Sequence, residues 1–398
     1  MLTTTRPRTT GDTRRIAVST TELRQLGTTT PDPDTARLLL ATRVSKRLLL
    51  LRTFLDAVPR PGESADHWAL LEAAERAAPE AVREVLHHPA VGSWAEETLR
   101  RLRASRPDAP PDLGYFGAMA AAAALRAGLD FSVRLRSGGR LLALPSLGAL
   151  RRERPGVLTV TAESWRQPPA DCQALPLHRL AGTTVTLDDL DPYRAPRPFG
   201  RVRPARRLTA QGRAQWDRRF TGAMALLDRV DPARAEEIRT LLSCVVPLAR
   251  TSRSAGATAP ATPGSVLLRP RARLDLAAAL VHEVAHGKLA ALSDLVRLHT
   301  AGPEPHYRVP WRPDRRPFEG LLHGTYAHAA LAGWWRRAAH AGVDGASARH
   351  AHYGRQVTAV LPVLVGSRHL TPEGHEFVGA LADHGARIRS RNTEEGRQ

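Results

Sequence analysis

The sequence predicts a mainly α fold with a smaller β-rich region, an α+β arrangement. Apolar residues recur at three- and four-residue spacing over most of the chain, and near residues 131–135 this spacing changes to strict alternation. Gly and Pro residues separate the periodic stretches. A length of 398 residues with 42% apolar content is ample for a large buried core.

Composition shifts divide the chain into five regions. Residues 1–30 are rich in Thr and Arg and are expected to be a flexible tail. Residues 31–130 are expected to be helical, 131–200 β-rich, 201–264 helical with a loop, and 265–390 a helical catalytic region.

Individual elements follow from the same patterns. We expect a β-hairpin in which residues 131–135 pair with 140–144 across the Gly138-Gly139 turn. Helices are expected at 33–58, 67–78, 79–88, 93–103, 113–127, 216–227, 232–244, 274–297, 319–340 and 353–364, and a Pro-rich loop at 301–317.

The formal charge of +19 comes almost entirely from arginine, because Lys46 and Lys288 are the only lysines. The arginines are scattered and aromatic residues make up only 5%, which disfavours a nucleic-acid partner and favours compositional bias and solubility. Two cysteines, Cys172 and Cys244, make neither a tetrahedral thiolate site nor a disulfide framework. With no stretch of 18 apolar residues and no signal-like start, we expect a cytoplasmic protein with no membrane partner.

The segment from His282 to His286 reads His-Glu-Val-Ala-His and lies within 274–297, the longest strongly periodic helical stretch. Residues i and i+4 share one face of a helix, so both imidazoles can meet one ion. The surrounding stretch is apolar nearly all round, and burying two histidines and Glu283 without partners would cost several kcal/mol. A bound cation removes that problem, whereas the alternative is two exposed histidines on a surface helix. The sequence therefore predicts a metal held by His282 and His286.

A catalytic metal site usually has three protein ligands. His323 is the preferred third ligand, because its helix follows a long loop and can pack antiparallel beside the first one. His328 competes with it, and Glu319 and Asp294 are the carboxylate alternatives.

Beyond the histidines, the sequence resembles the HExxH-motif proteins that accompany ribosomally made peptide natural-product precursors. The resemblance rests on residues 280–289 (LVHEVAHGKL), 309–317 (VPWRPDRRP) and 320–327 (GLLHGTYA), in that order. Upstream, residues 88–95 (HPAVGSWA) and 144–148 (LPSLG) are similar too. The match spans roughly residues 35–365. Departures occur at 284–285 (VA), 251–254 (TSRS) and 314–316 (DRR), and they concern the choice of substrate.

The resemblance implies an iron(II)- and 2-oxoglutarate-dependent hydroxylase that acts on a β-carbon of a residue in a ribosomal precursor peptide. It implies that His282, His286 and His323 hold the iron. The 2-oxoglutarate carboxylate then needs an arginine, for which Arg312 and Arg316 are candidates, with a solvated surface charge as the alternative. Tyr326, one turn from His323, would orient a ligand, or it is simply a core tyrosine.

Glu283 separates two mechanisms. In a zinc metallopeptidase it would be the general base that activates the metal-bound water. In the hydroxylase it supports the ligands or adds one itself. A third hypothesis is a precursor-binding protein with an inactive site. Trp311, Trp334 and Trp335 either line a peptide groove or pack in the core.

Overall fold

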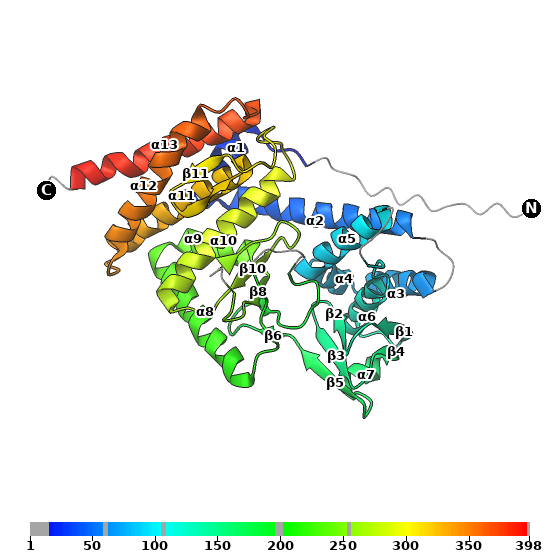
Figure 1. Cartoon of the computed structure of the whole chain (residues 1–398). Helices are drawn as coiled ribbons and strands as arrows, with labels where there is room; N and C mark the ends of the chain where they lie inside the picture. The colour runs from blue at the N-terminus through cyan, green and yellow to red at the C-terminus, as the bar shows by residue number, and fades with distance from the viewer. Residues whose placement is uncertain (1–15, 59–62, 105–108, 196–201, 253–255, 396–398) are drawn as a thin grey trace, which may run out of the picture.

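The computed structural model describes residues 16–58, 63–104, 109–195, 202–252 and 256–395 (Figure 1). Helices dominate and the strands form small sheets, which confirms the mainly α fold with a smaller β region. The helices are α1 (Thr20–Gly27), α2 (Pro33–Ala57), α3 (Glu63–Ala77), α4 (Pro79–Leu86), α5 (Pro89–Arg103), α6 (Gly114–Ala127), α7 (Ala162–Arg166), α8 (Ala210–Val230), α9 (Pro232–Leu241), α10 (Arg273–Ser293), α11 (Phe318–His340), α12 (Ala346–Val365) and α13 (Pro372–Glu395).

The strands are short and lie in several separate sheets. They are β1 (Ser132–Ser137), β2 (Leu141–Leu144), β3 (Gly148–Arg152), β4 (Gly156–Thr161), β5 (Cys172–Pro176), β6 (His178–Arg179), β7 (Thr186–Leu187), β8 (Cys244–Pro247), β9 (Gly256–Ala257), β10 (Ser265–Leu268), β11 (Tyr307–Val309) and β12 (Arg312–Arg316). A five-stranded sheet with the order β6-β7-β8-β10-β9 lies at the centre of the molecule, and its β7, β8 and β10 run parallel.

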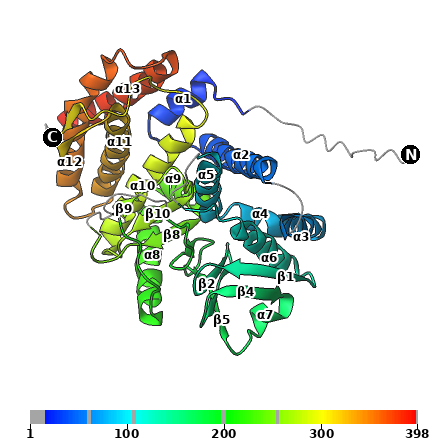
Figure 2. The same cartoon turned by 45° about the vertical axis from the view of Figure 1, so that its right-hand side comes forward.

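One hydrophobic core fills the N-terminal half, between α2–α6 and strands β1–β4. Figure 2 shows α3, α4 and α6 beside the β1/β4 pair, away from the C-terminal helices. The Ala-rich helix α6 is its centre. Residues 118–124 of α6 are buried, and their small side chains let α3 and α4 approach closely. Gly128 ends α6 in the left-handed conformation at φ 69°, as a C-terminal glycine should.

A second hydrophobic core lies in the C-terminal half, where α10 is surrounded by α8, α9, α11 and the central sheet. Helix α2 contributes to both cores. Leu39 near its start belongs to the second core, and Leu51 and Phe54 near its end belong to the first. In Figure 1, α2 extends from the C-terminal helices to the α3–α5 group.

The expected hairpin of residues 131–135 with 140–144 is wrong in its pairing. Strand β1 pairs with β4, antiparallel, from Ser132 opposite Thr161 to Ser137 opposite Gly156. Strand β2 pairs instead with β3, which continues to β5. The Ser137 hydroxyl donates to the carbonyl of Gly139, and the turn there leads β2 into another sheet.

Four further expectations need correction. Part of the expected tail, Thr20–Gly27, is helix α1, capped by a reciprocal pair of hydrogen bonds between Ser19 and Glu22. The helix expected at 232–244 ends at Leu241, and Cys244 begins β8. The expected 301–317 loop contains the β11/β12 hairpin, and α13 lies beyond the expected helices. The sequence also predicts a loop at 192–204, and residues 196–201 of it lie outside the described residues. In the described part of the chain, no helix is both long and apolar enough to cross a membrane.

Candidate metal centre

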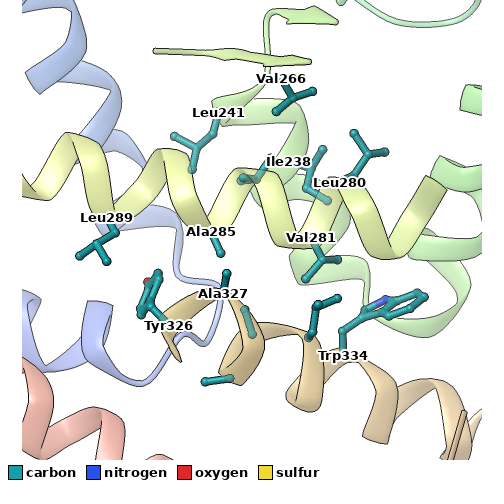
Figure 3. Packing of buried hydrophobic residues seen from close by; sticks show 14 of the residues in the cluster. Ile238, Leu241, Val266, Leu280, Val281, Ala285, Leu289, Tyr326, Ala327 and Trp334 are labelled. Carbon is teal, nitrogen blue, oxygen red and sulfur yellow. The ribbon is translucent and has the colours of Figure 1, made fainter. Parts of the chain in front are cut away.

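Helix α10 is held between two layers of apolar side chains. Ile238 and Leu241 of α9 and Val266 of β10 pack on one side, and Ala327 and Trp334 of α11 lie on the other (Figure 3). The labelled residues in Figure 3 show that α10 and α11 run in opposite directions. A histidine on the α11 side of α10 therefore faces α11 rather than open water.

His282 and His286 bring their Nε2 atoms to 3.1 Å from each other. Two imidazole nitrogens bound to one ion, each about 2.0–2.1 Å away, are roughly 2.8–3.4 Å apart for ligand angles between octahedral and tetrahedral. The pair thus has the separation that one shared ion requires. The rings meet edge to face at 82°, with centroids 4.7 Å apart, so both nitrogens converge on one point.

Helix α11 adds His323 and His328 to this pair. The His323 ring lies parallel to that of His286, with centroids 5.7 Å apart. The His328 ring lies 5.5 Å from that of His282. The two α11 histidines, rivals for the third ligand position, thus flank the pair at opposite ends.

The side chains do not yet form a closed set of three ligands. Within the ranges that the structure describes, no third His, Cys, Asp or Glu has a ligand atom within 4.8 Å of both Nε2 atoms. A rotation of the His323 or His328 side chain is needed to bring a third nitrogen to an ion at the pair. The donor set fits a metal in its chemistry, and its third member is not poised in this conformation.

All four imidazoles favour the neutral form that binds metal. Burial lowers the pKa of His282 and of His323 to about 4 and that of His328 to about 3. Burial, followed by the charges of the other three histidines, holds the pKa of His286 well below its usual value. The cluster therefore offers four neutral nitrogen donors at neutral pH.

Aromatic rings cover the His328 end of the cluster. Trp311 lies edge to face against His328 at 4.5 Å, and Tyr353 of α12 lies 5.2 Å from the same ring. Trp311 also lies over Gly324 so closely that a Cβ there would stand 2.6 Å from its Cζ2 atom. Gly324 is therefore what lets Trp311 close over the histidines. This placement gives Trp311 a position at the site, whereas Trp334 and Trp335 are buried core residues.

Glu283 contacts residues outside the histidine cluster. Its Oε2 accepts a hydrogen bond from Thr258 Oγ1 at 2.8 Å, and its Oε1 lies 2.5 Å from where a Cβ of Gly256 would be. Burial raises the pKa of Glu283 to about 7, against the hydrogen bond from Thr258 and the charge of Arg271. Strand β9 and Thr258, which follows it, thus fix the position of this carboxyl group beside α10.

The two arginines expected to bind a co-substrate lie on β12. Arg312 is exposed and its Nε donates to Asp314 at 3.0 Å, and Arg316 pairs with the same carboxylate at 3.4 Å. Both side chains are thus directed along the hairpin toward Asp314. The carboxylate alternatives for the third ligand also lie elsewhere, because Asp294 pairs with Lys46 at 2.9 Å and Glu319 is exposed.

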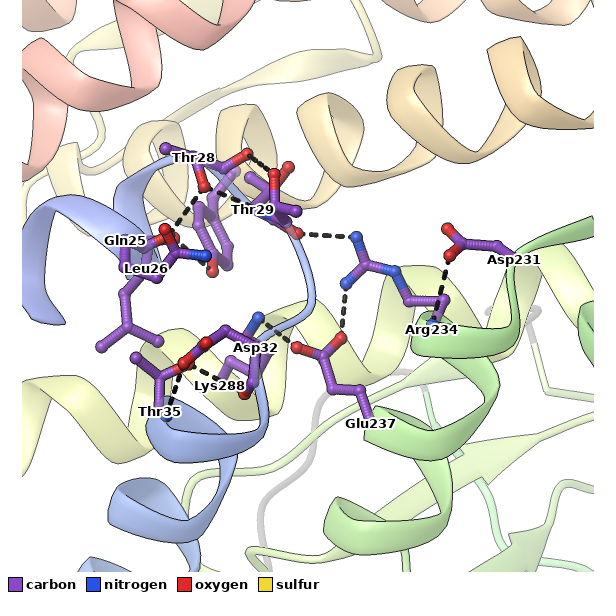
Figure 4. Close-up of polar contacts among 12 residues, drawn as sticks. Gln25, Leu26, Thr28, Thr29, Asp32, Thr35, Asp231, Arg234, Glu237 and Lys288 are labelled. Atoms are coloured by element: carbon purple, nitrogen blue, oxygen red, sulfur yellow. Dashed lines mark hydrogen bonds and ion pairs between the residues drawn. The ribbon is translucent and has the colours of Figure 1, made fainter.

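Tyr326 faces a different partner from the one expected. Its hydroxyl donates to the backbone carbonyl of Leu26 at 2.9 Å, so the structure places it among core residues. Close by, Lys288 donates to Glu237 Oε1 at 2.5 Å, and Glu237 also accepts from Arg234 (Figure 4). Lys288, for which the sequence suggested no role, is one partner in this buried charge network.

Sequence reasoning missed Arg271, Thr258 and Tyr353. Arg271, just before α10, acts electrostatically on both Glu283 and Tyr353, and the Tyr353 ring packs on His328. The contacts of the β12 arginines lead to Asp314 instead. No local pattern marks Arg271 among so many arginines, and Thr258 lies in a stretch of low complexity.

A comparison with models of known protein families found no match for this sequence. A comparison with curated proteins found no match either.

Proposed function

We propose that this protein is an iron(II)- and 2-oxoglutarate-dependent hydroxylase that acts on a β-carbon of a residue in a ribosomally made precursor peptide. The observation that carries the metal-enzyme part is the convergence of two neutral imidazole nitrogens, 3.1 Å apart, on a buried helix. The choice of reaction rests on the sequence resemblance together with the position of Glu283.

Glu283 supports the hydroxylase over a zinc peptidase. A peptidase base must reach water bound to the metal. Here Thr258 Oγ1 donates to one carboxyl oxygen and the other is packed against Gly256, so the protein itself already engages the group. Nothing in the hydroxylase reaction requires this group to take a proton, so its buried position is compatible with that reaction.

Iron(II) with bound 2-oxoglutarate supplies the oxidation: one atom of O₂ enters the peptide C–H bond, and the other enters succinate as 2-oxoglutarate loses CO₂. His282, His286 and one α11 histidine would hold the iron. Trp311 and Tyr353 would limit the access of water to the cluster, because their rings pack on His328.

Arg271 is our candidate for the distal carboxylate of 2-oxoglutarate. The guanidinium group binds carboxylates through two parallel hydrogen bonds. Its charge acts on Tyr353, whose ring packs on His328 of the cluster. Arg312 and Arg316 pair with Asp314 on the hairpin and are the weaker candidates.

The test is anaerobic reconstitution with iron(II), followed by measurement of succinate formed from 2-oxoglutarate and O₂ without peptide, with ascorbate added as the two-electron reductant that takes the place of the peptide C–H bond. We expect iron-dependent succinate that disappears in His282→Ala and persists in His375→Ala, an exposed histidine of α13. Arg271→Met should raise the KM for 2-oxoglutarate at least tenfold, and Arg312→Met should leave it unchanged.

Glu283→Gln separates the mechanisms. The hydroxylase should keep most of its succinate formation in this variant, whereas a peptidase would lose its activity. Zinc-dependent cleavage of peptides that vanishes in Glu283→Gln, with no succinate under any condition, would overturn the proposal in favour of the peptidase. Peptide binding without either activity would indicate the inactive-site hypothesis.

A further inference from the structure

A second group of potential metal ligands lies outside the histidine cluster. His88, Asp188 and Cys244 bring one ligand atom each to within 4.8 Å of one another, and all three residues are buried. They come from three separate segments: His88 is the N-cap of α5, Asp188 follows β7, and Cys244 begins β8.

Backbone pairing fixes two of the three positions. Strands β7 and β8 are parallel partners, and the backbone N–H of Asp188 donates to the carbonyl of Val245 at 2.9 Å. Asp188 Oδ1 accepts from the backbone N–H groups of Leu190 and Asp191, at 3.0 and 2.9 Å. The orientation of the carboxylate is therefore set, and its Oδ2 faces His88.

The atoms that face each other are unsatisfied. Asp188 Oδ2 and both ring nitrogens of His88 have no hydrogen-bond partner, although the side chains are only 0% and 4% exposed. His88 Nε2 and Asp188 Oδ2 are 3.8 Å apart, which is too long for a hydrogen bond. Buried polar atoms without partners destabilise a fold, and a cation bound between these two atoms would satisfy both of them.

The same distance suits two ligands of one ion. Donor atoms about 2.0–2.2 Å from a shared zinc ion are roughly 3.3–3.9 Å apart at tetrahedral to wider angles. The charges also suit a dication, because a carboxylate and a thiolate together neutralise it. These two negative charges are needed here, because the positive charges of Arg47 and Arg126 also act on His88 and would repel a cation.

We propose that His88, Asp188 and Cys244 are three protein ligands of a buried zinc ion that joins the start of α5 to the central sheet. Imidazole, carboxylate and thiolate are all zinc donors, and the thiolate favours zinc over magnesium or calcium. The alternative use of these residues, a cysteine nucleophile with a histidine base, needs access for a substrate, and Cys244 is only 1% exposed. This site is independent of the proposed reaction at His282.

The experiment uses the full chain in an H282A/H286A background, so that the first cluster holds no metal. After dialysis against zinc and then buffer, metal content is measured by mass spectrometry, and the zinc is replaced by cobalt(II). We expect one bound equivalent and a near-ultraviolet thiolate-to-cobalt charge-transfer band. Because the first cluster contains no cysteine, the band reports on Cys244 and not on the proposed hydroxylase site.

Three further variants complete the test. Cys244→Ser should abolish the band, whereas Cys172→Ser, which alters the only other cysteine, should keep it. Asp188→Asn should lower zinc affinity at least tenfold even where the fold, checked by circular dichroism, is intact. A band that survives Cys244→Ser, or a folded H282A/H286A protein that binds no zinc or cobalt, would overturn the proposal.

Discussion

Glu237 is the shared acceptor of two buried cations in the C-terminal core, and its replacement should destabilise that core strongly. Its carboxylate receives Lys288 Nζ at 2.5 Å on one oxygen and the guanidinium group of Arg234 on the other. The side chains of Lys288 and Glu237 are each 1% exposed, and that of Arg234 is 5% exposed. Glu237→Gln removes the only negative charge in this trio and leaves two buried cations.

The expected magnitudes differ between the two ends of the pair. Removing one partner of a buried ion pair costs about 3–5 kcal/mol, so Glu237→Gln should lower the free energy of unfolding by that amount. Lys288→Met should cost less, about 1–2 kcal/mol, because Arg234 still neutralises the carboxylate and an apolar side chain of similar length fills the space. The order of the two losses is therefore the test.

Guanidinium denaturation followed by tryptophan fluorescence measures these free energies. The matched control is Arg239→Met, which breaks an exposed pair with Asp228 whose side chains are 44% and 45% exposed. That variant should lose less than about 1 kcal/mol. A loss in Lys288→Met equal to or greater than that in Glu237→Gln, or losses in both within the range of the control, would refute the reasoning.

Three other predictions concern pH, helix α13 and the third metal ligand. Burial alone would raise the pKa of Glu237, but the charges of its two cationic partners outweigh it and hold the pKa below its usual value. This stabilisation is present above the unfolded pKa of about 4.3 and is lost as pH falls through the folded pKa. The difference in unfolding free energy between wild type and Glu237→Gln should therefore shrink below pH 4. A difference that stays constant from pH 7 to pH 3 would contradict this prediction. Gly374→Ala should destabilise the protein by more than about 2 kcal/mol, because its Cβ would stand 1.9 Å from a backbone carbonyl oxygen. The Cβ of Gly379→Ala, in the same helix, meets no other atom, so this variant should stabilise the protein by up to about 1 kcal/mol. Thermal melts measure both changes, and equal melting temperatures for the two variants would count against the prediction. His323→Ala should weaken iron binding at His282 and His286 more than tenfold. His328→Ala should weaken it less, because the rings of Trp311 and Tyr353 pack on His328 and restrict its rotation. If metal titration gives the reverse order, His328 is the third ligand.

The sequence predicted the helices well because their apolar periodicity is local. Residues 33–58 and 319–340 were expected to be helical, and α2 and α11 match them within one residue. The same reasoning placed His282 and His286 on one helical face, as the 3.1 Å separation of their Nε2 atoms bears out.

Strand partners were not predictable in the same way. Alternation marks residues that suit a strand, but β1 pairs with β4 rather than the nearer β2 through contacts that only the folded chain supplies. Helix α1 was missed although Ser19 and Glu22 form a capping box, because so short a helix depends on packing against α13. The signal was there, and the composition of the preceding residues obscured it.

The candidate sites show the same division. The spacing of His282 and His286 is visible in five consecutive residues, but His88, Asp188 and Cys244 are brought together only by the fold. Arg312 and Arg316 were chosen for lying between two ligand-bearing helices, and the hairpin directs them to Asp314 instead. Closeness in the chain was a poor guide to closeness in space at that point.

Helix α2 has a consequence for any attempt to divide this protein. Because one continuous helix supplies Leu39 to one core and Phe54 to the other, no cut on either side of it yields two self-sufficient pieces. A fragment beginning after residue 58 would leave holes in both halves, and a fragment ending there would expose apolar surface on both ends of the helix. Limited proteolysis should therefore not release a stable fragment of either half, and the halves expressed separately should not fold, because both cores need residues of α2.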